Sequence, residues 1–239
     1  MRLYFIPKHT LLGGFLLALF LITGIISCGL IDIYREETLA RIGEIMVLVD
    51  PGHGGVDGGT SDRWGNLEKD INLGMGQQIA RQLQSGGMRV IMTRDRDLAL
   101  APFNGQPGRH RRDLQERIRR ARERDCLFLV SVHCDWSRDT TESGAKVFYN
   151  ALEPQSKQLA TLIQEELNQV QTRQRKAAPG KYLIIRQKGV TGVIVEVGFL
   201  SNSAEALLLQ NEMHRTRLAL AIARGTLRYA QCFMDQSNI

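Results

Sequence analysis

The 239-residue sequence predicts a single α/β domain with a mostly parallel, twisted sheet covered by helices on both faces, preceded by an N-terminal membrane segment. Three observations support this fold class. Short apolar runs alternate with amphipathic stretches at the spacing of βαβ units. The apolar runs are continuous rather than alternating, which is typical of parallel strands buried on both faces. A long uncharged stretch precedes the first of these runs.

The uncharged stretch, from Leu11 to Ile31, follows the basic residues Arg2 and Lys8. Roughly 20 apolar residues are enough to cross a bilayer. Basic residues before such a stretch keep the N-terminus in the cytoplasm and lead to export of the rest of the chain. We therefore expect a cytoplasmic region at residues 1–10 and an extracytoplasmic working domain.

Residues 11–33 are interpreted as a signal anchor or a lipoprotein signal, and residues 34–44 as a polar linker. A signal peptide usually has a shorter apolar core than this one, which favours an uncleaved anchor. The sequence "IISC", ending at Cys28, is similar to the lipobox of bacterial lipoproteins. Both alternatives tether the domain to the membrane.

The predicted domain spans residues 45–231 and begins with a strand. Ile45–Asp50, "IMVLVD", is a short β-branched apolar run. The next stretch, "KDINLGMGQQIARQLQSGG", has apolar residues at helical spacing and ends in two glycines, so it predicts a helix. Met88–Arg94 predicts a second strand, and the prolines and turn formers of residues 95–110 predict a long loop.

"RRDLQERIRRARERD", residues 111–125, predicts a charged helix, and Cys126–His133 predicts a buried strand after it. "AKVFYN" predicts a strand, and "EPQSKQLATLIQEELNQV" a helix with Pro154 in its first turn. "YLIIR" and "GVIVEVGFL" predict two further strands. The rest predicts one or two closing helices with Ser201 or Ser203 as N-cap, and a tail at residues 232–239.

The formal charge of +6 is compatible with an anionic partner but does not identify it. The arginines of residues 109–124 alternate with acidic residues at spacings that indicate a solvated helix. An exported domain also argues against nucleic acid. The four cysteines form no CxxC pair, so a zinc–thiolate site is not expected, and Cys126 and Cys134 are expected to be buried thiols.

Polar residues follow three of the predicted strands, where functional groups of open α/β sheets gather. His53 lies in a glycine-rich loop after the first strand, and the same loop leads to Glu68 at a helix start. His133 ends a second strand, and Glu196 lies inside the last one. We expect these four side chains to converge at one edge of the sheet.

Two imidazoles and one carboxylate, His53, His133 and Glu68, form the ligand set of a catalytic zinc site. Glu196 suits the role of a proton acceptor that does not bind the metal. A carboxylate within "VIVEVGF" is unfavourable to bury unless it has a partner. Phosphate binding is the other common use of a glycine-rich loop, but "GHGGVDGG" lacks the spacing of a Walker or a dinucleotide motif.

The sequence resembles the zinc-dependent N-acetylmuramoyl-L-alanine amidases of bacterial cell walls. The motifs that carry the resemblance extend from Val47 to Tyr229 and include "DPGHGGVDGG", "EKD", "SVH", "AKVFY" and "VEVGFLSN". Within this family, the sequence is most similar to the germination-specific branch of spore formers.

The resemblance implies one Zn²⁺ ligated by His53, Glu68 and His133, with Glu196 as the catalytic glutamate. Arg117 matches an arginine of the family, and its implied role is to support these four residues or the surrounding structure. Asp135 stands where the family often has Asn, which puts a substrate contact at this position in doubt.

The implied reaction is hydrolysis, by zinc-activated water, of the amide between N-acetylmuramic acid and L-alanine of the peptidoglycan stem. In the germination-specific branch this reaction prepares muramic lactam in spore cortex, before a separate deacetylase acts. The expected location is extracytoplasmic and membrane-anchored, in the forespore intermembrane space. Some members of this branch depend on a lipoprotein partner, and the sequence leaves open whether this chain needs such an activator.

Three other functions compete with this one. A catalytically silent relative that binds peptidoglycan or activates a partner is disfavoured by the presence of Glu196 and all three ligands. A zinc peptidase is disfavoured because the HxxE ligand spacing is absent. Nucleic-acid binding conflicts with the predicted export.

Overall fold

The computed structural model describes residues 20–27, 29–30, 36–37, 40–102, 107–187 and 189–236. The chain divides into two compact units, Met1–Arg41 and Ile42–Ile239. In the first unit, residues 20–27 are helical and exposed. Within the described part of the chain, no helix combines the length and the apolar character that a membrane span requires. Most of the predicted segment 11–33, Cys28 included, lies outside the described residues, so the anchor and the lipidation stay predictions.

The second unit is built on a six-stranded sheet with the order β2-β1-β3-β6-β4-β5. All neighbouring strands are parallel except β4 and β6, which are antiparallel. The single α/β domain with a mostly parallel sheet is therefore confirmed. The strands are β1 (Met46–Pro51), β2 (Arg89–Met92), β3 (Phe128–Asp135), β4 (Lys146–Tyr149), β5 (Ala178–Pro179) and β6 (Thr191–Phe199).

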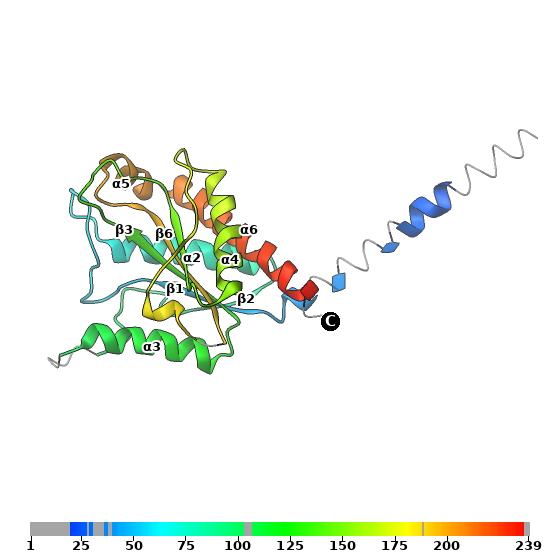
Figure 1. Ribbon diagram of the computed structural model, residues 1–239, viewed down its shortest axis with the longest axis horizontal. Helices are drawn as coiled ribbons and strands as arrows, with labels where there is room; N and C mark the ends of the chain where they lie inside the picture. Colours follow the sequence, from blue (N-terminus) through cyan, green and yellow to red (C-terminus); the bar gives the residue numbers. More distant parts are fainter. Residues whose placement is uncertain are drawn as a thin grey trace, which may run out of the picture. The chain divides into compact units, whose positions relative to one another are not determined.

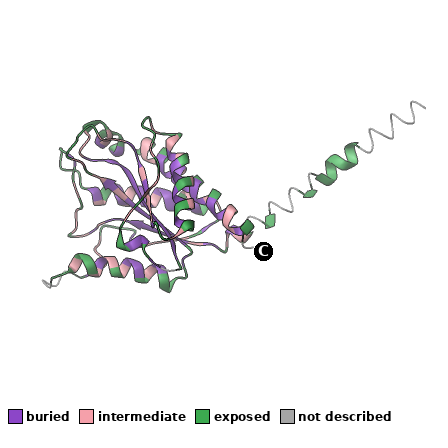
Figure 2. Ribbon diagram, in the orientation of Figure 1, coloured by how far each residue is buried: buried purple, intermediate pink, exposed green. Residues whose placement is uncertain are grey.

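Helices cover both faces of this sheet, as the continuous apolar strands predicted (Figure 1). One face packs against α2 (Glu68–Ser85), α4 (Pro154–Asn168) and α6 (Glu212–Gln236) and forms the larger core. The other face packs against α3 (Arg109–Glu123) and the 3-10 helix η1 (Leu183–Ile185) in a smaller core. Figure 2 shows the strands buried between these layers. The short helix α5 (Ser203–Gln210) follows β6.

The core extends slightly beyond the predicted limits of residues 45 and 231. Ile42 and Met234 are both buried. The assignment of the domains along the whole chain stays a prediction, because part of the chain before Ile42 is not described.

Two local predictions were wrong. The predicted strand "YLIIR" is the 3-10 helix η1, because Ile184 and Ile185 both pack into the smaller core instead of alternating between two faces. The N-cap of α5 is Asn202, not Ser201 or Ser203, and its side chain accepts hydrogen bonds from Ala204 N and Glu205 N.

The register of the sheet decides which side chains share a face. Asp50 pairs with Ser131, and His133 pairs with Glu196 across β3 and β6. Directly opposite residues of neighbouring strands point to the same face. Asp50, Ser131, His133 and Glu196 therefore lie on the face that carries α3 and η1, toward the carboxyl ends of the parallel strands.

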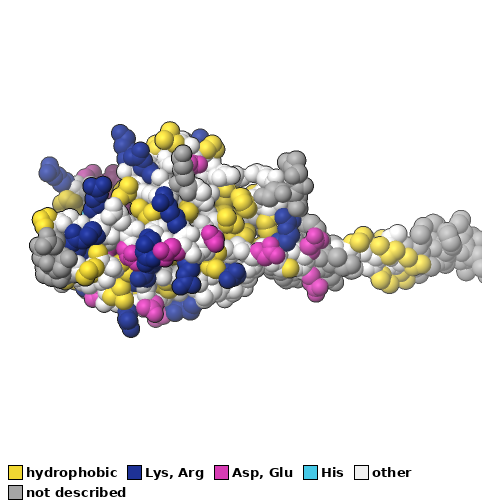
Figure 3. Space-filling model, turned by 90° about the horizontal axis from the view of Figure 1, so that it is seen from below, with side chains coloured by type: hydrophobic (Ala, Val, Ile, Leu, Met, Phe, Trp, Pro, Cys, Tyr) yellow, Lys and Arg dark blue, Asp and Glu magenta, His cyan; other side chains and the backbone are white. Residues whose placement is uncertain are grey.

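Charges on that side of the molecule are mixed. Figure 3 looks from the side of α3 and shows basic and acidic side chains interspersed over the face. On α3 itself, Arg119 and Arg120 form ion pairs with Glu116, and Arg119 also pairs with Glu123. These pairs confirm that α3 is a solvated helix with mixed charges.

Candidate metal centre

His53 projects from the loop after β1 and has a backbone conformation that non-glycine residues rarely adopt. Its φ is 61°, in the left-handed region. Gly54 and Gly55 on its C-terminal side also have positive φ, at 133° and 57°. The glycines of this loop therefore permit a tight turn that returns the chain toward α2 and presents the imidazole at the edge of the sheet.

Glu68 is the first residue of α2 and is buried, with 3% of its surface exposed. One carboxylate oxygen, Oε2, accepts a hydrogen bond from Thr60 N at 3.0 Å. The other, Oε1, accepts from Asn72 Nδ2 and from Cys134 N, both at 3.1 Å. These bonds orient the carboxylate toward the two histidines.

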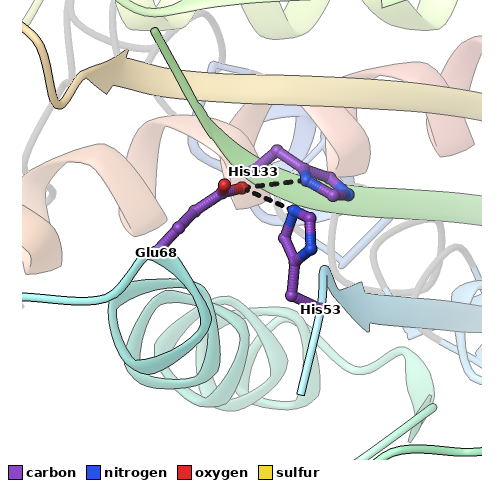
Figure 4. A group of neighbouring side chains, drawn as sticks. All are labelled: His53, Glu68 and His133. Atoms are coloured by element: carbon purple, nitrogen blue, oxygen red, sulfur yellow. Dashed lines mark hydrogen bonds and ion pairs between the residues drawn. The ribbon is translucent and has the colours of Figure 1, made fainter. Parts of the chain in front are cut away.

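The structure brings His53, Glu68 and His133 together (Figure 4). Glu68 Oε1 lies 3.2 Å from His53 Nε2 and 3.0 Å from His133 Nδ1. The two imidazole rings are edge to face, with centroids 4.9 Å apart. One ligand atom from each residue fits within a 4.8 Å span, the arrangement required of a metal site.

This donor set fits a zinc ion. Tetrahedral coordination at about 2.1 Å places neighbouring ligand atoms roughly 3.4 Å apart. The distances from Glu68 Oε1 to the two histidine nitrogens are close to that separation. Two imidazoles and one carboxylate also leave a fourth position for water or substrate, as in catalytic zinc sites.

The pKa values of Glu68 and His53 are shifted by their neighbours in this cluster. Burial alone would raise the pKa of Glu68, but the hydrogen bonds and charges of His133 and His53 outweigh burial and lower it. Burial would lower the pKa of His53, but Glu68 and Asp57 outweigh burial and raise it. Glu68 is therefore ionised, as a metal ligand must be.

Glu196 stands beside the cluster and is not one of its three ligands. Its Cα is registered opposite that of His133, and 8% of its surface is exposed. Its Oε2 atom is buried without a hydrogen-bond partner among the described residues. Burial, followed by the charges of Asp135 and Glu68, raises the pKa of Glu196 well above its usual range. The register places this buried carboxylate beside the cluster, and its role as a proton acceptor stays a prediction.

Arg117 connects α3 to the loop that carries His53. Its guanidinium donates to His53 O at 2.7 Å and to Pro51 O at 2.8 Å. It also forms ion pairs with Asp50 at 2.6 Å and Asp113 at 2.8 Å. These contacts hold the backbone of the His53 loop in place.

Asp135 is separated from the cluster by a bulge between β3 and β6. Its Oδ1 atom accepts a hydrogen bond from Trp136 N at 2.7 Å. Burial raises the pKa of the nearby Tyr182, and the charges of Glu196 and Asp135 raise it further. A substrate contact of Asp135 stays a prediction.

Several residues that support the site could not be singled out from the sequence. Asp57 Oδ1 lies 3.0 Å from His53 Nδ1, so that nitrogen is engaged and Nε2 faces Glu68. Arg94 donates to the carbonyl oxygens of Pro51, Gly52 and Lys69. Asp57 belongs to the glycine-rich motif and Arg94 ends a predicted strand, but spacing along the chain does not show which groups they contact.

Comparisons with known proteins agree with the geometry. The sequence profile of the family described as N-acetylmuramoyl-L-alanine amidase matches residues 47–228. A germination-specific N-acetylmuramoyl-L-alanine amidase of Bacillus subtilis (strain 168) is 37% identical over 225 residues, which cover 90% of this chain and 91% of that protein. A probable cell wall amidase of Staphylococcus aureus, LytH, is 27% identical over 83% of this chain and 64% of its own length.

Solved structures share the fold. The CwlD amidase from Clostridioides difficile, in complex with the GerS lipoprotein, aligns with a TM-score of 0.75 and 30% identity over 78% of this chain and 98% of that chain. The catalytic domain of CwlV, from Bacillus (Paenibacillus) polymyxa var. colistinus, aligns with a TM-score of 0.68 and 27% identity over 77% and 97% of the two chains. The profile match and the 37% identity confirm the resemblance, and the chain belongs to the N-acetylmuramoyl-L-alanine amidase family.

Proposed function

We propose that this chain is a zinc-dependent amidase that hydrolyses the bond between N-acetylmuramic acid and L-alanine in peptidoglycan. The observation that carries the proposal is the juxtaposition of His53, Glu68 and His133 within a 4.8 Å span, with Glu196 registered beside His133. Family membership supports the substrate class.

His53, Glu68 and His133 would hold one Zn²⁺. A bound zinc ion supplies Lewis acidity to the amide carbonyl and makes water acidic enough to ionise near neutral pH. The protein keeps the three ligands in place with the hydrogen bonds to Glu68 and with the contact between Asp57 and His53. Such supporting bonds fix the orientation of ligands and strengthen metal binding.

Glu196 is proposed to move the proton. Its unpartnered Oε2 atom accepts a proton from water as the water attacks the amide carbonyl. The same carboxyl then donates the proton to the nitrogen of L-alanine as this nitrogen leaves. Its raised pKa suits both steps, because a general acid–base group works best when its pKa approaches the working pH.

The biological setting proposed is spore cortex, in maturation through muramic lactam formation and in germination. Support comes from the name of the Bacillus subtilis relative, a germination-specific amidase. The amidase would act before a separate muramic acid deacetylase. It would work outside the cytoplasm, in the forespore intermembrane space, tethered by the N-terminal segment. No nucleic acid is expected to bind.

A lipoprotein partner is also proposed. The support is that the similar Clostridioides difficile amidase was solved in complex with the GerS lipoprotein.

The role in spore cortex is tested by mass spectrometry of cortex fragments from a deletion strain. Loss of muramic lactam is expected, and an unchanged amount of muramic lactam would contradict the role in cortex.

The chemistry is tested with Glu196→Gln in the zinc-loaded protein. We expect the variant to keep one zinc per chain by metal analysis and to lose about 10²–10⁴-fold in kcat on muropeptides, because the proton acceptor is gone. Glu165→Gln is the matched control, since Glu165 is exposed on α4, which covers the opposite face.

Two outcomes would contradict the proposal. If the Glu196→Gln variant cleaved muropeptides at the normal rate, Glu196 would have no role in proton transfer. A folded wild-type protein that binds no zinc and cleaves no muropeptide, yet binds peptidoglycan, is a silent relative rather than an enzyme.

A further inference from the structure

A line of side chains leads from Glu196 along β4 to a cavity. Because β4 is antiparallel to β6, Lys146 is registered opposite Glu196, and β4 then runs away from the metal ligands. Side chains two residues apart on a strand share a face. Lys146, Phe148 and Asn150 therefore follow one another on the face that carries Glu196.

Two ring contacts show that this line is continuous. The Nζ atom of Lys146 lies 4.9 Å from the centroid of the Phe148 ring. The ring of Tyr182 meets that of Phe148 edge to face, with centroids 5.5 Å apart. Tyr182 is 39% exposed and follows directly on Gly180 and Lys181. Phe148 and Tyr182 thus lie between Lys146 and the cavity.

The cavity has a volume of about 460 Å³ and is lined by residues that include Asn150, Leu152, Pro179, Gly180, Lys181 and Arg186. We call it the basic cavity. Lys181 and Arg186 are exposed, and neither side chain has an ion-pair or hydrogen-bond partner among the residues that the structure describes. None of the described residues that line it is acidic.

This arrangement differs from that of the arginines on α3. Arg119 and Arg120 are neutralised by glutamates of their own helix. Lys181 and Arg186 instead line a hollow together with the apolar side chains of Leu152 and Pro179, and neither cation is paired with a described residue. Free cations beside a hollow can bind a carboxylate, while the apolar walls can bind the aliphatic part of the same ligand.

We propose that the basic cavity binds a carboxylate of the stem peptide and thereby selects stems with a free acid at that position. The inference rests on the proposed amidase function and names the subsite for the leaving part of the substrate. The four-residue step from Lys146 to Asn150 covers about 13 Å at the rise of a strand. An extended peptide of three or four residues spans roughly 10–14 Å. A stem that begins at Glu196 with L-alanine therefore reaches Lys181 and Arg186 with its third or fourth residue.

The experiment uses two muropeptides that differ only in the stem: one with free carboxylates and one with these carboxylates amidated. The double variant Lys181→Gln with Arg186→Gln is compared with the wild-type protein, both zinc-loaded. Two exposed ion pairs are together worth about five- to tenfold in binding, so the wild type is expected to prefer the free acid by about that factor in kcat/KM. In the double variant, the ratio of kcat/KM for the free acid to kcat/KM for the amide is expected to fall toward one. The change is expected in KM and not in kcat.

Two further proteins make the test specific. The matched control, Arg81→Gln with Arg224→Gln, removes the same charge from exposed positions on α2 and α6 and keeps the preference. The charge-preserving variant Lys181→Arg with Arg186→Lys also keeps it, which separates charge from a general disturbance of the loop.

A double variant that folds, cleaves and discriminates as the wild type does would overturn the subsite. Equal loss in the control pair would also overturn it, because a nonspecific charge effect would then explain the result. A wild-type protein that cleaves neither muropeptide contradicts the amidase function itself, and so the two failures are distinguishable.

Discussion

His53 carries a candidate ligand on a backbone conformation that is strained for an L residue. A non-glycine residue at φ 61° is uncommon and has a cost of about 1–3 kcal/mol. Arg117 counteracts this cost because it binds the carbonyl oxygens of both His53 and Pro51. The strain is thus held in place by the surrounding structure, which keeps the imidazole at the edge of the sheet before any metal binds.

Gly52 next to His53 is required for space. A Cβ atom at this position would lie 2.2 Å from Cε1 and 2.3 Å from Nε2 of His133. Because the ring of His133 also contacts Glu68, it cannot turn aside without leaving the cluster. We expect Gly52→Ala to weaken zinc binding by at least tenfold in a competition titration with a chelator.

Gly58→Ala is the matched control for this prediction. It lies in the same loop, and the nearest atom to its Cβ would be Leu67 Cδ2, at 3.4 Å, an ordinary contact. Zinc affinity is expected to stay within about twofold of the wild type. Equal loss in both variants would mean that the loop, rather than the His133 ring, responds to the substitutions.

Helices α4 and α6 approach each other closely at Gly225. A Cβ atom there would lie 2.4 Å from the Cα atom of Ile163 and 2.7 Å from its N atom. Backbone atoms cannot rotate away as a side chain does, so the helices must separate. We expect Gly225→Ala to lower the free energy of unfolding by about 1–3 kcal/mol in urea denaturation, as overpacked cores do.

Gly74 on α2 provides the contrast. Its Cβ would come no closer than 3.9 Å to Arg215 Nε. There the higher helix propensity of alanine should raise the free energy of unfolding, by about 0.5–1 kcal/mol. If Gly225→Ala were stabilised to the same degree, the close contact of α4 with α6 would be contradicted.

Asp50 joins four segments of the domain in one buried network. Its carboxylate accepts hydrogen bonds from Thr93 Oγ1 at 2.6 Å and from Ser131 Oγ at 2.7 Å, and it pairs with Arg117. Burial would raise the pKa of Asp50, but Arg117 and the two hydroxyl groups outweigh burial and lower it. The folded state therefore binds a proton at this carboxylate less readily than the unfolded chain, whose value is about 3.9.

The sign of the pH dependence follows from this difference. The contribution of Asp50 to stability is fully present above about pH 4–5 and is lost as the pH falls through the pKa of the folded state. Asp50→Asn removes the charge at every pH. We expect this variant to be less stable than the wild type by about 3 kcal/mol near pH 7, with the gap narrowing below about pH 4.

Urea unfolding at several pH values between 7 and 3 measures that gap. Asp235→Asn, at an exposed position on α6, should unfold in parallel with the wild type throughout. If the difference in free energy of unfolding between Asp50→Asn and the wild type did not change with pH, the charge of Asp50 would not be the source of its stabilising effect.

Much of the architecture could be predicted from local sequence. The β-branched runs of β1, β3 and β6 and the helical spacing of α2 predicted both the elements and the doubly covered sheet. The wrong assignment of "YLIIR" has a physical cause. Apolar periodicity over five residues does not separate a strand from one turn of a 3-10 helix, and so Ile184 and Ile185 were assigned to a strand.

The sequence by itself determined the candidate ligands, through the types of residue that follow the strands. Parallel strands end at the same edge of the sheet, and so they bring the residues after them together at that edge. His53, Glu68, His133 and Glu196 could be named for that reason. Only the tertiary structure decided the partners of Asp50, Arg117 and Asp57, and the meeting of Lys181 with Arg186 at one hollow. These contacts depend on the register of β3 with β6 and of β4 with β6, and on how α3 and η1 pack. Such long-range choices are made by packing over the whole domain, and no local pattern specifies them.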